Sequence, residues 1–156
     1  MSLVLPAQLS GAMTDREAIT DALNRAVLSF DMADEALLHS AVTDGLYAEM
    51  PAVTSKGIEE LKAIPWAHIS KMVTTHLVSN VRVDITDSQN AKVTASVIAQ
   101  HVVAGKEFEM GNKFLAGSVY LCDVVKVEGL WKLSSWKVKI IWTEGDRAVM
   151  NGDGNQ

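Results

Sequence analysis

The sequence predicts an α+β domain in which helices precede an antiparallel sheet. Two patterns of apolar residues along the chain support this prediction. Apolar residues recur at helical spacing in the N-terminal half, and from about Thr74 onward they alternate with polar residues at the period of a strand. The length of 156 residues fits one domain with its own core. A long sheet that helices cover on one face should curve around them into a cone that can hold a small ligand.

The first helix has a clear start. The segment 14–17, Thr-Asp-Arg-Glu, is a capping box, in which a hydroxyl at the N-cap and a glutamate three residues later satisfy the unpaired amides of the first turn. Apolar residues then follow at helical spacing from Ile19 to Phe30. The spacing predicts an amphipathic helix of about four turns.

Three further elements are expected before residue 74. Asp34 can cap a short helix that ends near Val42. A short strand is expected over 46–52, where a proline stops it, and a third helix over about 57–72. Pro65 lies inside this third helix and should kink it.

The C-terminal half predicts long strands in an antiparallel meander. The expected ranges are 74–86, 92–103, 115–127 and 130–143. Asp87 to Asn90 forms a turn, and Glu128-Gly129 forms a tight hairpin.

The domain boundaries follow from composition. Residues 1–13 are interpreted as an N-terminal arm. The short apolar stretch at their start is broken by Pro6, and it has neither a basic beginning nor the length to span a bilayer. Residues 14–146 are expected to form the single domain. Residues 147–156 end in Asn-Gly-Asp-Gly-Asn-Gln and are expected to form a flexible tail.

Charge and cysteine content limit the partners and the compartment. The chain has 14 basic and 19 acidic residues, a net charge of −5, which argues against a nucleic-acid partner. No membrane partner is expected. The single Cys122 cannot form an intrachain disulfide, which favours a cytoplasmic location.

Two histidines and an aspartate are the candidate catalytic residues. His101 lies in mid-strand on a face otherwise made of Val and Ala, so its imidazole needs a partner inside the cone. Asp31 ends the first helix against the helix dipole and also needs a donor, so we expect Asp31 to pair with His101. His76 begins the preceding strand and can reach the same cavity. The alternative for His101 is a core histidine with an ordinary hydrogen-bond partner, and the alternative for Asp31 is a solvated aspartate at a helix end. His39 and His68 are interpreted as surface residues.

Six further side chains are expected to line the pocket or to belong to ordinary core. They are Tyr47, Met50, Phe114, Tyr120, Cys122 and Trp142. A buried phenol needs a hydrogen-bond partner and can donate to a substrate oxygen, which favours Tyr120 as a ligand-binding residue.

Common cofactor motifs do not occur in the sequence. There is no Gly-rich phosphate loop, nucleophile elbow or paired-cysteine motif. Two histidines and an aspartate could form a facial iron triad, but they are scattered and no His-x-Asp pair occurs. Neither a metal nor a cofactor is therefore expected.

An ordered set of short segments resembles the SnoaL-like branch of the NTF2-like superfamily, in its scytalone dehydratase-like group, over about residues 14–146. The segments are 30–34 (FDMAD), 75–80 (THLVSN), 100–102 (QHV), 118–123 (SVYLCD), 129–133 (GLWKL) and 142–146 (WTEGD). The resemblance implies a cone-shaped α+β barrel with an internal pocket, assembled as a dimer or a trimer.

The resemblance also implies site roles. In scytalone dehydratase an Asp–His pair and a second His serve an elimination next to a carbonyl, and by position these roles fall on Asp31, His101 and His76. The tyrosine before that aspartate is Phe30 here, and a serine and an asparagine near the carbonyl correspond roughly to Tyr120 and Cys122. The pocket, and with it the substrate, should therefore differ.

The function expected from these features is a cofactor-independent lyase or isomerase acting on a small polyketide- or terpenoid-like metabolite. His101 would be the acid and base, oriented by Asp31, while His76 and Tyr120 bind a substrate oxygen or a water. The alternatives are a non-catalytic small-molecule-binding module and a ring-rearranging isomerase.

Assembly is expected through the outer face of the sheet. This face carries Thr94, Ser96, Ile98 and Val102, and a sheet with both faces partly apolar needs cover. A homo-oligomer is therefore expected.

Overall fold

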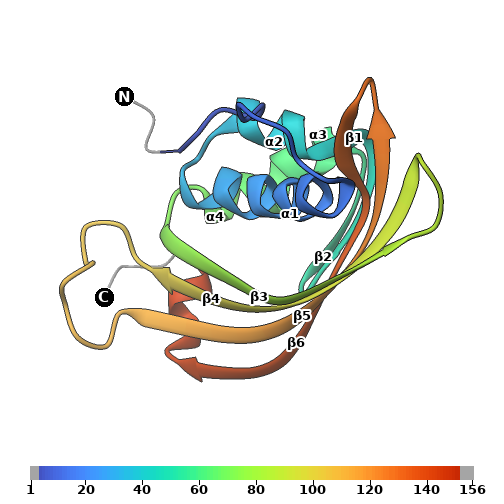
Figure 1. Ribbon diagram of the computed structural model, residues 1–156. Coiled ribbons are helices and arrows are strands. Elements are labelled where there is room, and N and C mark those ends of the chain that lie inside the picture. Colours follow the sequence, from blue (N-terminus) through green and yellow to red (C-terminus); the bar gives the residue numbers. More distant parts are fainter. Residues whose placement is uncertain (1–3, 152–156) are drawn as a thin grey trace.

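A curved six-stranded sheet wraps around the helices without closing into a full barrel (Figure 1). The computed structural model describes residues 4–151. The strand order is β2 (Val53–Lys56), β1 (Val42–Met50), β6 (Leu130–Gly145), β5 (Lys113–Val127), β4 (Asn90–Val102) and β3 (Val73–Ile85), so β2 and β3 are the free edges. The helices occupy the concave side of the sheet, as the α+β pattern predicts. The expected fold class is confirmed, with an open sheet in place of a barrel.

The longest helix, α1 (Asp15–Asp31), begins where the capping box predicts. The Thr14 hydroxyl accepts from the backbone N–H of Glu17, and the Glu17 carboxylate accepts from the backbone N–H of Thr14 at 2.7 Å. Its apolar stripe from Ile19 to Phe30 is buried. The last residue of α1, Asp31, is thereby brought to the edge of the core.

The next helices are shorter than α1. Asp34 caps α2 (Glu35–Ala41) by accepting from the backbone N–H of Leu37. The expected third helix is divided into α3 (Ile58–Leu61), a π-helical turn η1 (Lys62–Trp66) and α4 (Ala67–Ile69). Pro65 lies in the π-helical turn, because proline cannot donate a backbone hydrogen bond and its ring displaces the preceding turn.

The antiparallel meander is formed as expected by the four long strands. These are β3 (Val73–Ile85), β4 (Asn90–Val102), β5 (Lys113–Val127) and β6 (Leu130–Gly145).

The expectation of an entirely antiparallel sheet is wrong at one seam. Strand β1 (Val42–Met50) pairs parallel with β6, and an additional strand β2 (Val53–Lys56) pairs antiparallel with β1. No hairpin joins β1 to β6. Their relative direction is set instead by the number of strands in the meander that brings β6 back beside β1.

The expected C-terminal tail is also wrong for its first residues. Arg147–Asn151 form a 3₁₀ helix, η2, whose Val149 is buried against Phe114 and Ala116. This apolar contact holds η2 against the start of β5. Residues 152–156 lie outside the described residues, and residues 4–13 contain no helix or strand.

No helix in the described part of the chain is both long and apolar enough to cross a membrane.

Candidate functional site

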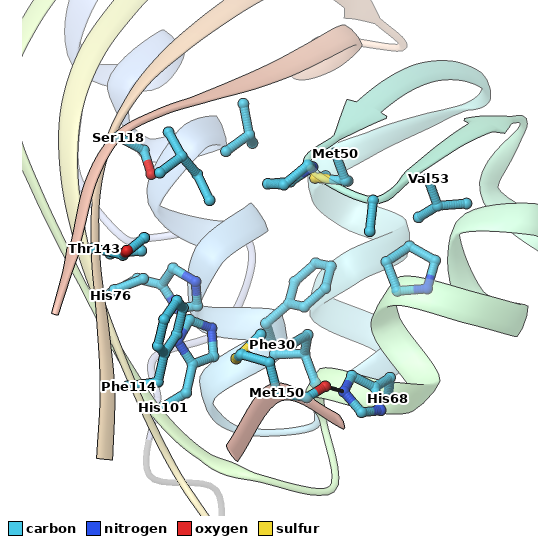
Figure 2. Close-up of a pocket in the computed structure, with 18 of the residues that line it drawn as sticks. Phe30, Met50, Val53, His68, His76, His101, Phe114, Ser118, Thr143 and Met150 are labelled. Atoms are coloured by element: carbon cyan, nitrogen blue, oxygen red, sulfur yellow. Dashed lines mark hydrogen bonds between the residues drawn. The ribbon is translucent and has the colours of Figure 1, made fainter. Parts of the chain in front are cut away.

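A cavity of about 720 Å³ lies between the concave face of the sheet and the helices. Apolar side chains make up most of its wall, among them Val27, Phe30, Met50, Ile69, Phe114, Trp136, Val138 and Met150. The polar side chains in the lining are His68, His76, His101, Ser118, Tyr120, Thr143, Arg147 and Asn151. Figure 2 shows His76 and His101 beside each other on one wall of this cavity, next to Phe114.

The register of β3 and β4 brings the two histidines together. Thr74 lies opposite His101, and His76 lies opposite Ala99, so all four side chains share the inner face of the sheet. The imidazole centroids of His76 and His101 are 5.9 Å apart, and the rings meet edge to face. The expectation that both imidazoles share one cavity agrees with this arrangement.

Asp31 pairs with His76 and not, as expected, with His101. Nδ1 of His76 lies 2.6 Å from Oδ1 of Asp31, and the backbone N–H of His76 donates to Oδ2 at 2.9 Å. The hydroxyl of Thr74 donates to Oδ1 at 2.7 Å. The end of α1 lies against the edge strand β3, whereas His101 lies one strand further into the sheet. The carboxylate therefore reaches His76 first.

These hydrogen bonds determine the charge of Asp31. Burial raises the pKa of its carboxyl, but the hydrogen bonds and charge of His76, together with the Thr74 hydroxyl, outweigh burial and lower the pKa below its ordinary value. The ionised carboxylate only accepts hydrogen bonds, so Nδ1 of His76 carries the proton. The lone pair of a neutral His76 is then on Nε2.

His101 is held in its neutral form. Burial, and then the neighbouring His76, lower the pKa of its imidazole to about 4. Nδ1 of His101 is buried and has no hydrogen-bond partner among residues 4–151. The ring lies 6.2 Å from that of Phe114, its neighbour on β5. A neutral imidazole with one N–H can donate a hydrogen bond, but it is a weak base at this pKa.

Three of the six expected pocket residues line the cavity: Met50, Phe114 and Tyr120. The phenol of Tyr120 is buried, and burial raises its pKa, so the hydroxyl keeps its proton. It makes no hydrogen bond to any described residue. Its O–H therefore remains available to a ligand.

Tyr47 and Cys122 do not line the cavity. Tyr47 is exposed, because the side chains of β1 alternate and Leu46 and Ala48 take the inner face. Its ring lies instead under the ammonium of Lys137. Cys122 does face inward, but it lies in the closed core beyond the cavity, opposite Trp136.

Trp142 faces outward because of a β-bulge in β6. Trp142 pairs with Gly117 and Ile140 with Ser118, which leaves Ile141 as the additional residue. Strict alternation from Ile140 would have turned Trp142 inward. The bulge instead turns Thr143 into the cavity and leaves Trp142 on the outer face, 44% exposed.

Several residues of the site were not anticipated. His68 was expected at the surface, but it lines the cavity, and its Nε2–H donates to the carbonyl of Met150 at 2.8 Å (Figure 2). The π-helical turn before His68 changes the number of residues per turn, so helical periodicity does not predict which face His68 occupies. Arg147 falls in the expected C-terminal tail, where no helical or strand period points to the cavity. Thr74 could have been found, since it is two residues before His76 and shares its face of the strand.

No group of three or more His, Cys, Asp or Glu side chains in the described region is arranged to hold a metal ion.

Comparison with known proteins identifies the family of this chain. A family model described as a SnoaL-like domain matches residues 11–137. The chain belongs to the SnoaL-like family. A curated relative, the terrestric acid biosynthesis cluster protein E of Penicillium crustosum, is 39% identical over 148 residues, which cover 93% of this chain and 95% of that protein.

Solved structures of other proteins share the fold. One is a provisionally assigned scytalone dehydratase of Novosphingobium aromaticivorans, with a TM-score of 0.74, 22% identity and coverage of 86% of this chain and 93% of that chain. Another is the type 3 hexachlorocyclohexane dehydrochlorinase LinA of Novosphingobium barchaimii, with a TM-score of 0.70, 20% identity and coverage of 85% and 90%. The expected similarity to the scytalone dehydratase-like group is confirmed at the level of the fold.

Proposed function

We propose that this SnoaL-like protein is a cofactor-independent lyase or isomerase that moves a proton next to a carbonyl in a small, mostly apolar ring compound. One observation carries the proposal. An ionised Asp31 holds Nδ1 of His76 at 2.6 Å, and His76 lines an apolar cavity of about 720 Å³.

His76 is the general base in this proposal. Its Nε2 takes a proton from the carbon next to the carbonyl, and the C–H electron pair moves into an enolate. The Asp31 carboxylate stabilises the imidazolium that forms and keeps the ring in one tautomer. The imidazolium then returns the proton to another carbon, which gives an isomer, or to a departing hydroxyl, which gives an alkene and water.

His101 takes the role of a hydrogen-bond donor. With a pKa of about 4 it is neutral near pH 7, so its N–H can stabilise the enolate oxygen without competing for the substrate proton. The hydroxyl of Tyr120, which is also in the lining, is a second donor. These roles of His76 and His101 are the reverse of those expected from the sequence, because Asp31 lies against His76.

Membership of a biosynthetic cluster in the Penicillium relative supports a substrate from secondary metabolism. The solved structures, all below 25% identity, support the fold alone.

Incorporation of solvent deuterium tests the proposal without knowledge of the natural product. Cyclic ketones and ketone-containing polyketide fragments are incubated with the protein in D₂O, and uptake at the carbon next to the carbonyl is followed by NMR. We expect His76→Gln to lower the exchange rate by about 10²–10⁴-fold. We expect a comparable loss with Asp31→Asn, whose amide favours the wrong tautomer.

Matched controls separate chemistry from folding. His39→Gln and Asp84→Asn make the same substitutions outside the cavity, at a half-buried and an exposed position, and should leave exchange unchanged. Tight binding of ring compounds with no exchange above the protein-free rate would defeat the enzyme proposal. The mostly apolar lining would then favour the binding module.

A further inference from the structure

The cavity lining contains one permanently charged side chain, Arg147, and no carboxylate among the described residues. The nearby Asp31 is not part of the lining. Its side chain is 5% exposed and is occupied by Thr74 and His76. A ligand in the cavity therefore meets one fixed positive charge and no exposed negative one.

The fold brings Arg147 to the end of the cavity that holds the histidines. Gly145 pairs with Phe114, and Phe114 pairs with His101, so η2 begins two residues beyond this row of the sheet. Three contacts fix η2 there. Val149 packs on Phe114, the backbone N–H of Asp146 donates to the Lys113 carbonyl at 3.0 Å, and His68 donates to Met150.

The guanidinium of Arg147 has no partner of its own. It makes no ion pair or hydrogen bond with any residue in the described part of the chain, although Asp146 precedes it in the sequence. A guanidinium offers a planar fork of N–H donors that matches a carboxylate in a bidentate arrangement. Arg147 is exposed to solvent and also lines the cavity, so its guanidinium can meet the negative group of a ligand whose ring lies in the apolar interior.

We propose that the ligand of this cavity is an organic anion, an apolar ring that carries a carboxylate or an acidic enol, and that Arg147 binds its negative group. The ring lies against Phe30 and Trp136, and the reacting carbon faces His76. This inference rests on the proposed function in one respect, that the ligand occupies the same cavity. Binding of the anion requires no turnover, so the two proposals can fail separately.

Two fluorescent probes with the same ring system test the charge preference. Anilinonaphthalene sulfonate carries an anionic group as a stand-in for the carboxylate, and phenylnaphthylamine is its neutral parent. Both are titrated into the full chain. Ala99 lines the cavity, so Ala99→Trp should fill the cavity and abolish binding there. Only the part of each probe's binding that this variant abolishes is counted as cavity binding, and its affinity is the one compared. We expect Arg147→Gln to weaken binding of the sulfonate about 10-fold or more and to change the neutral probe less than 2-fold.

Two further variants complete the design. Arg147→Lys keeps the charge and should recover part of the sulfonate affinity. Arg82→Gln removes an exposed arginine at the opposite end of β3, which has no partner among the described residues, and should change neither probe. Equal weakening of both probes by Arg147→Gln, or of neither, would overturn the proposal. Absence of deuterium exchange by the wild-type protein, with its anion preference intact, would instead overturn the proposed chemistry.

Discussion

Asp31 and His76 are 45 residues apart in the chain, yet one carboxylate accepts both the ring N–H and the backbone N–H of the histidine, at 2.6 and 2.9 Å. Asp31 is the last residue of α1, and His76 lies on the edge strand β3. The pair therefore joins the end of a helix to the edge of the sheet. The same contact that would orient His76 for the proposed proton transfer also contributes to stability.

The pH dependence of stability should report the Asp31 pair. Because the pKa of Asp31 is lowered in the folded protein, its contribution is full above the unfolded value of about 3.9 and is lost as pH falls through the folded value. We expect the stability advantage of wild type over Asp31→Asn to shrink on acidification below about pH 4, measured by urea unfolding. The exposed Asp84→Asn should show no such convergence. A constant difference down to pH 2 would contradict the prediction.

His101 should destabilise the protein in mildly acidic solution. Its pKa is about 4 in the folded state and about 6.5 when unfolded, so the unfolded chain takes up the proton first and stability falls between pH 6.5 and 4. The full effect is on the order of 3 kcal/mol. His101→Gln should flatten this part of the stability profile, whereas His39→Gln should not. An imidazole of His101 that titrates near pH 6.5 by NMR would refute the assignment.

Arg25 should be a major contributor to stability. It is 3% exposed, and its guanidinium donates to Asp21 at 2.8 Å, to the Ser40 hydroxyl at 3.0 Å and to the Trp131 carbonyl at 2.8 Å. Arg25→Met keeps most of the apolar stem but leaves these acceptors unpaired. We expect unfolding free energy to fall by about 2–4 kcal/mol. Arg82→Met is the exposed control, and a loss below about 1 kcal/mol would show that water replaces the guanidinium.

The outer face of the sheet should mediate assembly. Leu77, Ile98, Gly117 and Trp142 form one row across four strands, and three of them are exposed large apolar side chains. The indole of Trp142 lies on Gly117, where an added Cβ would come within 2.2 Å of the ring. Val102, expected on this face, is buried instead. The row is thus the apolar part of the surface that needs cover.

We predict a homo-oligomer through this row. Light scattering at micromolar concentration should give a multiple of the chain mass, and Ile98→Lys should shift it toward one chain. Ser88→Lys, in the exposed turn between β3 and β4, is the matched control. Wild-type protein that is monomeric under these conditions would contradict the prediction.

Local patterns predict much of the architecture. The capping box locates the start of α1, because it depends on residues three positions apart. Alternation along β4 correctly predicts that His101 faces inward with Ala99. Each of these patterns lies within a single helix or strand, and a local sequence pattern carries information only about the element that contains it.

The errors occur where two elements meet or where one element is interrupted. The bulge at Ile141 reverses the face of Trp142, and the π-helical turn at Pro65 hides the inward position of His68. One inserted residue changes which side of a strand or helix every later side chain occupies. Such an insertion depends on the neighbouring strand or packed surface as well as on the residues themselves.

The sequence by itself determined the α+β order, the start of α1 and the inner face of β4, on which His101 lies. Only the tertiary structure decided that Asp31 binds His76, that β1 runs parallel to β6 and that η2 brings Arg147 into the cavity wall. Periodicity specifies the face of an element on which a side chain lies. The distance between two side chains on different elements is fixed by strand register and helix packing, which depend on contacts across the whole core.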